Sequence, residues 1–112
     1  MSKSLTTTEG KRQQAELLEL IPPSEILREE FMAPLGVSQN QLARDIDVPP
    51  ARINDIVHGR RGISADSALR LSAYFGTTAE FWLGLQMEFD LRRARRETWP
   101  SVEPRIRPRR AA

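Results

Sequence analysis

Two short helices separated by a tight turn are the feature that most constrains the fold, and they lie in residues 38–59. Ser38 is a favourable helix N-cap, and Gln41 three residues later completes a capping-box pattern. Pro49 and Pro50 suit the first turn of a second helix, and Gly59 suits the position that ends it. The sequence therefore predicts one helix after Ser38 and another from the proline pair to Gly59.

Both predicted helices are amphipathic. Their apolar residues recur at helical spacing: Leu42, Ala43 and Ile46 in the first helix, and Ile53, Ile56 and Val57 in the second. Such a pair is typical of a helix-turn-helix, whose second helix can lie in the major groove of DNA. An ordinary helical hairpin that binds no DNA has the same pattern, and these residues alone leave both interpretations open.

Three further helices complete an all-α prediction of five helices. They cover about residues 25–35, 65–75 and 79–91, the last of them continuing into the arginines that follow Leu91, and the caps that start them are Ser24, Ser64 and Thr78. Pro34 and Gly36 limit the first, and Leu69 belongs to the apolar stripe expected on the second. No strand pattern and no internal repeat occurs in the sequence. Residues 23–91 are thus expected to form one domain, flanked by flexible extensions over residues 1–22 and 92–112. The C-terminal extension is expected to be extended or disordered beyond Thr98.

The composition excludes several classes of protein. The chain has 112 residues, one histidine and no cysteine, so it offers no disulfide framework, no thiolate metal site and no visible nucleophile–base pair. We therefore expect no enzyme activity, no metal and no cofactor. The N-terminus has no apolar signal core and no stretch is long enough to span a membrane, which predicts a cytoplasmic protein.

The charge is unevenly distributed. Residues 92–112 carry eight arginines and two glutamates, a net charge of +6, whereas residues 1–91 carry −4. Residues 38–63 are only slightly basic, with four arginines against three aspartates. A nucleic-acid reader usually has a clear basic face, so this chain must use a local patch, a dimer or its tail. The tail is either a solvated end or a contact to DNA backbone or to an acidic partner.

The last helix is apolar on two sides, which favours a homodimer. Its first face holds Phe81, Trp82, Leu85 and Phe89, which can pack on the domain. Its second face holds Leu83, Met87 and Leu91 at four-residue spacing, and we expect these three residues to form a dimer interface. The alternative is that the helix lies at the centre of a small bundle.

The sequence resembles the HigA-type antitoxins of the Xre/Cro helix-turn-helix group. The similarity covers about residues 23–91 and is strongest over residues 59–71 and 75–86, where Phe81-Trp82-Leu83 and Gln86 form its most specific part. It implies a Cro/lambda-repressor-like fold and a bacterial antitoxin that dimerises. It further implies repression of the protein's own operon at a palindromic operator, and neutralisation of a HigB-type toxin, an mRNA-cleaving ribonuclease.

The resemblance also implies which residues contact DNA. The base-contacting positions are those at and after the start of the second motif helix: Pro50, Ala51, Arg52, Asn54 and Asp55. Arg52 is the best donor among them, because a guanidinium group can pair with O6 and N7 of guanine. Phosphate contacts are expected from Gln39 by analogy with the wider repressor group, and from Arg60 and Arg61, which follow the helix.

The toxin would bind elsewhere on the chain. HigB-type toxins are basic because they bind RNA, so an acidic surface suits them. The acidic residues of the N-terminal half are Glu16, Glu19, Glu25, Glu29 and Glu30. The alternative is that these carboxylates only keep the protein soluble.

Two other functions remain open at this stage. One is a stand-alone Xre-type transcriptional regulator without a toxin partner, which a neighbouring toxin gene would distinguish from an antitoxin. The other is an adaptor that binds protein rather than DNA, and this interpretation stays open because residues 1–91 lack a net positive charge.

Overall fold

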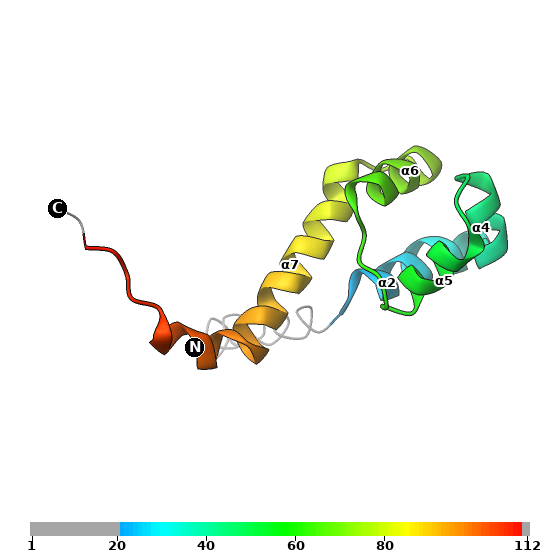
Figure 1. The fold of residues 1–112 in the computed structure, drawn as a ribbon. Coiled ribbons are helices and arrows are strands. Elements are labelled where there is room, and N and C mark those ends of the chain that lie inside the picture. Colours follow the sequence, from blue (N-terminus) through cyan, green and yellow to red (C-terminus); the bar gives the residue numbers. More distant parts are fainter. Residues whose placement is uncertain (1–20, 111–112) are drawn as a thin grey trace, which may run out of the picture.

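The computed structural model describes residues 21–110, and every regular element in that part of the chain is helical (Figure 1). A first helix is built from α2 (Pro23–Ile26), the π-helical stretch η1 (Leu27–Met32) and α3 (Ala33–Leu35). It is followed by α4 (Gln39–Asp45), α5 (Pro50–Val57), α6 (Ala65–Phe75) and α7 (Ala79–Glu97). Two short turns, α8 (Trp99–Val102) and η2 (Glu103–Arg105), end the helical part. The five predicted helices are thus confirmed, with α8 in addition.

Three of the helices begin at the caps that the sequence predicts. Ser38 Oγ accepts a hydrogen bond from the Gln41 backbone N–H at 3.1 Å. Ser64 Oγ does the same for a backbone N–H of α6, and Thr78 Oγ1 accepts from the Phe81 N–H at the start of α7. Each of these bonds satisfies one of the N–H groups that a helix leaves unpaired in its first turn.

The first helix starts earlier than predicted, and Pro34 does not limit it. Pro22 is its N-cap, while Ser24 is buried within the first turn and caps nothing. The helix also continues through Pro34 to Leu35 before Gly36 turns the chain in the left-handed region, at φ 65°. A proline ring clashes with the carbonyl four residues earlier in a regular α-helix, and here that carbonyl belongs to Glu30, within the wider π-helical stretch.

The C-terminal extension is partly helical, so the expectation of an extended chain beyond Thr98 is wrong for residues 99–105. Pro100 and Pro104 each lie in the first turn of a short helix, where a missing N–H costs nothing. The chain becomes extended only from Ile106. The predicted N-terminal extension lies outside the described residues, except for its last two positions.

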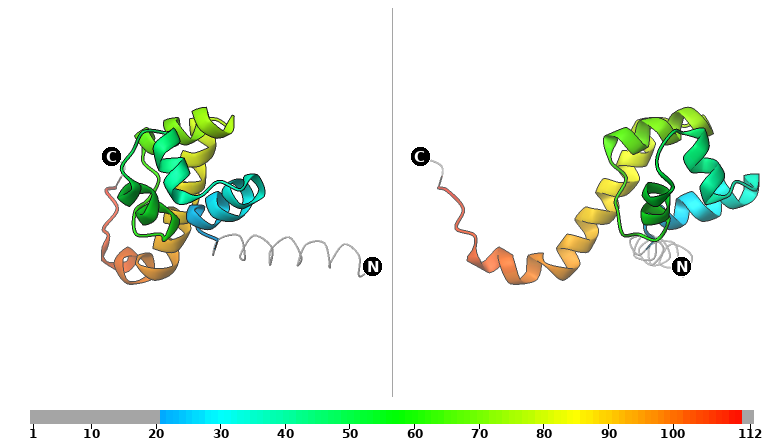
Figure 2. Two further views of the ribbon diagram at one scale, coloured as in Figure 1. Left: turned by 90° about the vertical axis from the view of Figure 1, so that its right-hand side faces the viewer. Right: turned by 45° about the vertical axis from the view of Figure 1, so that its right-hand side comes forward.

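The core lies between the first helix and α4 to α7, while α7 runs out of this core toward the C-terminal turns (Figures 1 and 2). Trp82 is fully buried at its centre, and its ring contacts those of Phe31, Phe75 and Phe81. The other fully buried large side chains are Leu27, Leu42, Ile53, Ile56, Val57 and Leu71. Leu69, predicted to face the core, is 62% exposed, because α6 turns its Ala68 and Leu71 side inward instead. None of the described helices is both long and apolar enough to cross a membrane.

We predict that Trp82→Ala lowers the free energy of unfolding by about 3–5 kcal/mol, because it removes a fully buried aromatic side chain and leaves a cavity. Urea denaturation measures the loss. Leu35→Ala is the matched control: its side chain is exposed on the first helix, and the change should cost less than about 0.5 kcal/mol. Equal losses of unfolding free energy for the two substitutions would contradict the central position of Trp82 in the core.

Candidate nucleic-acid interface

Helices α4 and α5 form the predicted helix-turn-helix. The turn between them places Asp47 in the left-handed region, at φ 57°, and the Val48 N–H closes it on the Ala43 carbonyl at 3.0 Å. Arg70 of α6 fixes this turn from outside, since its Nη1 donates to the carbonyls of Ile46 and Asp47 at 2.7 and 3.0 Å. The angle between α4 and α5 is therefore held by backbone and side-chain hydrogen bonds as well as by apolar packing.

Helix α5 buries one side and leaves the other accessible. Ile53, Ile56 and Val57 are buried as predicted. Pro50 and Ala51 are exposed at the start of the helix, and the remaining predicted base-contacting residues, Arg52, Asn54 and Asp55, are half-buried. Their partial burial reflects hydrogen bonds to neighbouring elements, which the sequence did not indicate.

A hydrogen-bonded network joins two of the predicted phosphate-contacting residues across α5. Asn54 Nδ2 donates to Gln39 Oε1 at 3.1 Å, and Asn54 Oδ1 accepts from Arg60 Nη2. Arg60 Nε also pairs with Asp55 Oδ1 at 3.0 Å. Asn54 and Asp55 therefore orient Gln39 and Arg60 rather than standing free. Arg61 is exposed, and no partner of its side chain occurs among residues 21–110.

Arg52 belongs to a second network, between α5 and α6. Its Nη1 pairs with Asp66 Oδ2 at 2.5 Å, and Arg70 Nε pairs with the same oxygen at 2.9 Å. These hydrogen bonds, first from Arg52 and then from Arg70, lower the pKa of Asp66 below its ordinary value, because they favour the charged carboxylate. The sequence does not indicate this pairing, because Arg52 and Asp66 lie 14 positions apart on different helices.

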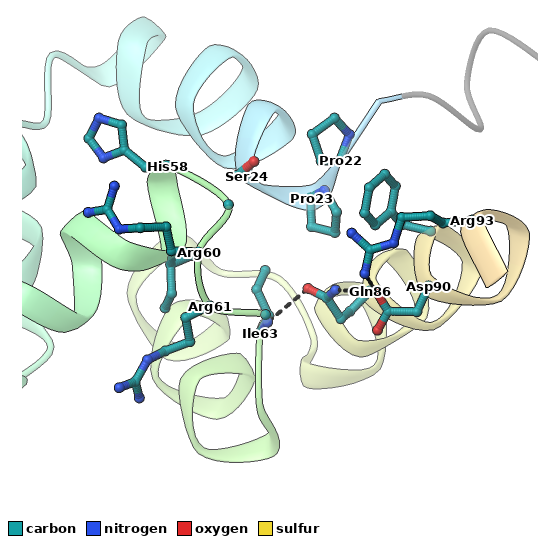
Figure 3. Close-up of a pocket in the computed structure, with 14 residues that line it drawn as sticks. Pro22, Pro23, Ser24, His58, Arg60, Arg61, Ile63, Gln86, Asp90 and Arg93 are labelled. Carbon is teal, nitrogen blue, oxygen red and sulfur yellow. Dashed lines mark hydrogen bonds and ion pairs between the residues drawn. The ribbon is translucent and has the colours of Figure 1, made fainter. Parts of the chain in front are cut away.

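The loop after α5 is fixed by Gln86 of α7, at the wall of a hollow of about 460 Å³ (Figure 3). Gln86 Oε1 accepts from the Ile63 N–H at 2.8 Å, and its Nε2 donates to Asp90 at 2.9 Å. A side chain at Gly62 would place its Cβ only 3.1 Å from the Gln86 amide carbon. Glycine at this position therefore lets Gln86 approach the loop that carries Arg60 and Arg61.

Known proteins share both the motif and the fold. The sequence profile of the helix-turn-helix family matches residues 27–82. Virulence-associated protein I of Dichelobacter nodosus is 51% identical over 77 residues, which cover 69% of this chain and 71% of that protein. The Pseudomonas aeruginosa antitoxin HigA with higBA promoter is 45% identical at a TM-score of 0.74, over 79% of this chain and 96% of that one. Antitoxin GraA in complex with its operator is 45% identical at a TM-score of 0.75, over 81% and 92% of the two chains.

This chain belongs to the HigA family of helix-turn-helix antitoxins. The sequence resemblance is thereby confirmed, and the structure gives physical reasons for the residues that carry it. Within the family pattern, Trp82 fills the core, and its indole N–H donates to Thr77 Oγ1 at 2.7 Å. Gln86 holds the loop after α5.

Two of the three residues that the second apolar face of the last helix was expected to contribute to a dimer interface are exposed. Met87 and Leu91 have 65% and 47% of their surface accessible, whereas Leu83 is half-buried and packs against the core. Beyond Leu91, the same side of α7 borders an apolar hollow of about 370 Å³, which Trp99 and Val102 of α8 complete. Trp99 therefore contributes to an apolar surface that continues the exposed stripe of α7.

The acidic residues expected to face a toxin are divided between described and undescribed parts of the chain. Glu29 and Glu30 are exposed on the first helix, and Glu25 is half-buried there. Glu16 and Glu19 lie outside the described residues. His58 is exposed, and its Nδ1 lies 2.8 Å from the Asn54 carbonyl oxygen. No cluster of three potential metal ligands occurs in residues 21–110.

We predict that Gln86→Leu makes the Ile63 amide exchange its hydrogen faster, because it removes the acceptor of that N–H. Hydrogen exchange followed by NMR measures this, and the free energy of unfolding should fall by about 1 kcal/mol. Gln41→Leu, the same change in α4, should leave Ile63 exchange as it is. Slow exchange at Ile63 in Gln86→Leu would show that the loop does not depend on Gln86.

Proposed function

We propose that the chain is a sequence-specific DNA-binding antitoxin that acts as a dimer in the cytoplasm. It represses its own toxin–antitoxin operon and neutralises a HigB-type mRNA-cleaving toxin. The observation that carries this proposal is the likeness, over about four fifths of the chain, to solved antitoxins that hold promoter or operator DNA. The accessible side of α5 agrees with it, since this is the side that a helix-turn-helix presents to the major groove.

The two networks around α5 give the DNA contacts separate roles. Arg52 contacts a base edge, near the exposed start of the helix at Pro50 and Ala51. Gln39, Arg60 and Arg61 contact phosphates and set the position of α5 in the groove. Asn54 and Asp55 hold Gln39 and Arg60 in place for this task.

We predict that Arg52→Ala costs about 1–3 kcal/mol of binding free energy on the operator and relaxes its sequence preference, because a guanine contact is lost. Gln39→Ala and Arg60→Ala should weaken binding to all duplexes alike, since phosphates carry no sequence information. Fluorescence anisotropy at several salt concentrations measures both effects. Arg44→Ala, which removes an exposed arginine of α4 outside the proposed interface, is the control. An unchanged operator affinity of Arg52→Ala would remove Arg52 from the base-contacting residues.

A dimer supplies two α5 helices about 34 Å apart, which matches one turn of DNA. The proposed interface is the exposed apolar stripe that begins at Met87 and Leu91 and continues to Trp99. This arrangement also raises the number of phosphate contacts per complex, which compensates for the low positive charge of each subunit.

We predict that Met87→Asp with Leu91→Asp yields a folded monomer, because two charges then lie on the apolar stripe. Sedimentation equilibrium at micromolar concentration measures the mass, and operator affinity should fall with dimerisation. Leu69→Asp places the same charge at an exposed leucine of α6 outside the stripe and should leave the dimer intact. A wild-type protein that sediments as a monomer would contradict the interface.

The toxin is proposed to bind the acidic side of the first helix, which leaves α5 free for the operator. A stand-alone regulator without a toxin is the second candidate, and it has the same DNA-binding surface. Co-expression with the adjacent gene distinguishes the two, because an antitoxin restores growth when its toxin is produced.

We predict that the combined variant Glu25→Gln, Glu29→Gln and Glu30→Gln rescues growth less well than wild type. The substitutions remove three negative charges from the surface that would attract a basic toxin. Its operator affinity should be unchanged. The control variant Glu97→Gln with Glu103→Gln removes charges at the C-terminal end of the chain and should rescue fully. Full rescue by the triple variant would exclude this surface, and no rescue by wild type would favour the stand-alone regulator.

A further inference from the structure

The pairing of Arg52 with Asp66 matters because Arg52 is the proposed base-contacting residue. Asp66 is the second residue of α6, and its carboxylate approaches α5 from the neighbouring helix. The same oxygen also binds Arg70, which in turn holds the carbonyls of the turn between α4 and α5. Asp66 is thus attached to a part of the fold that is itself fixed, so Arg52 is held by a partner with little freedom.

A guanidinium group has five N–H donors in one plane, and guanine requires two of them. Asp66 Oδ2 occupies Nη1 of Arg52 and leaves the other donors for a base edge. An arginine held in one rotamer loses less conformational entropy when it binds, because part of its freedom has been removed already. The charge of Asp66 also partly neutralises Arg52, which weakens attraction to phosphates of any sequence.

We infer that Asp66 is a specificity-determining positioning residue, which holds Arg52 for a guanine edge and limits its binding to DNA backbone. The inference rests on the proposed DNA-binding function and extends it to a residue of α6 outside the motif. Both effects of Asp66, the orientation of Arg52 and the partial neutralisation of its charge, increase the preference for the correct DNA sequence. Orientation favours the correct site, and the negative charge disfavours incorrect ones.

The experiment compares the affinities for two duplexes. One is the duplex that the wild-type protein enriches from a random-sequence pool, and the other is a shuffled duplex of equal length and composition. Asp66→Asn should lower the ratio of the two affinities about fivefold or more, since a bidentate arginine–guanine pair carries at least that much discrimination. Binding to the shuffled duplex should become tighter. In the Arg52→Ala background, Asp66→Asn should no longer change the ratio.

Two control variants distinguish the positioning of Arg52 by Asp66 from a general effect of lost negative charge and from a loss of stability. Glu80→Gln removes one carboxylate from the first turn of α7, where Glu80 is exposed, and should leave the ratio unchanged. Arg70→Met removes the contact that restrains Asp66 and releases the turn, but it leaves the Arg52–Asp66 pair itself in place. It should lower the melting temperature, and it should lower the ratio less than Asp66→Asn does. The inference is overturned if Asp66→Asn keeps the wild-type ratio, or if Arg70→Met lowers it equally. A wild-type protein that enriches no duplex would instead overturn the proposed function, and this inference with it.

Discussion

The burial of Trp82 is the interaction on which the position of α5 and its loop depends. The centroid of its ring lies 4.9 Å from the ring centroid of Phe31 in the first helix and 6.4 Å from that of Phe75 in α6. One side chain of α7 therefore packs against two other helices. The hydrogen bond from its indole N–H to Thr77 leaves no buried donor unsatisfied. Gln86 lies four residues later, on the same side of α7, and reaches the loop after α5. Core packing therefore extends directly to the proposed phosphate-contacting residues.

Arginines around α5 are paired with nearby aspartates, which compensate their positive charge. Arg52 and Arg60, two of these arginines, are each paired with an aspartate, Asp66 and Asp55 respectively. Such pairs contribute little to stability at a surface, but they restrict arginine side chains to defined positions. If this surface binds DNA as proposed, the paired aspartates would weaken its attraction to the DNA backbone, and the affinity would depend on correct geometry. This accounts for a nucleic-acid reader whose first 91 residues carry a net negative charge.

Local signals were enough to predict most of the fold. The caps at Ser38, Ser64 and Thr78 and the apolar stripes of α4 and α5 depend on residues close together in sequence, and the structure has them as predicted. The start of the first helix and its passage through Pro34 were missed, because π-helical geometry has no clear local signal. Helical turns at Pro100 and Pro104 were missed because proline favours both helix starts and extended chain.

The sequence predicted which elements carry the candidate site, but it did not predict the hydrogen bonds and ion pairs between the residues of the site. The resemblance and the motif placed Gln39, Arg52 and Arg60 on or beside α5. Their partners were not predictable, because Arg52–Asp66 joins residues 14 positions apart and Gln39–Asn54 residues 15 apart, in contacts that only the packing of helices creates. Exposure of Met87 and Leu91 followed from helical spacing, whereas the partial burial of Leu83 depends on how α7 rotates against the core.

The most direct test of DNA reading by α5 is a dimethyl sulfate footprint of the wild-type protein on the DNA upstream of its own gene. This reagent methylates guanine N7 in the major groove, the atom that an arginine of α5 would cover. We expect two protected groups of guanines, related by a palindrome and centred one helical turn apart, about 10–10.5 base pairs. Protein bound to this DNA with every guanine N7 still reactive would contradict major-groove reading by α5.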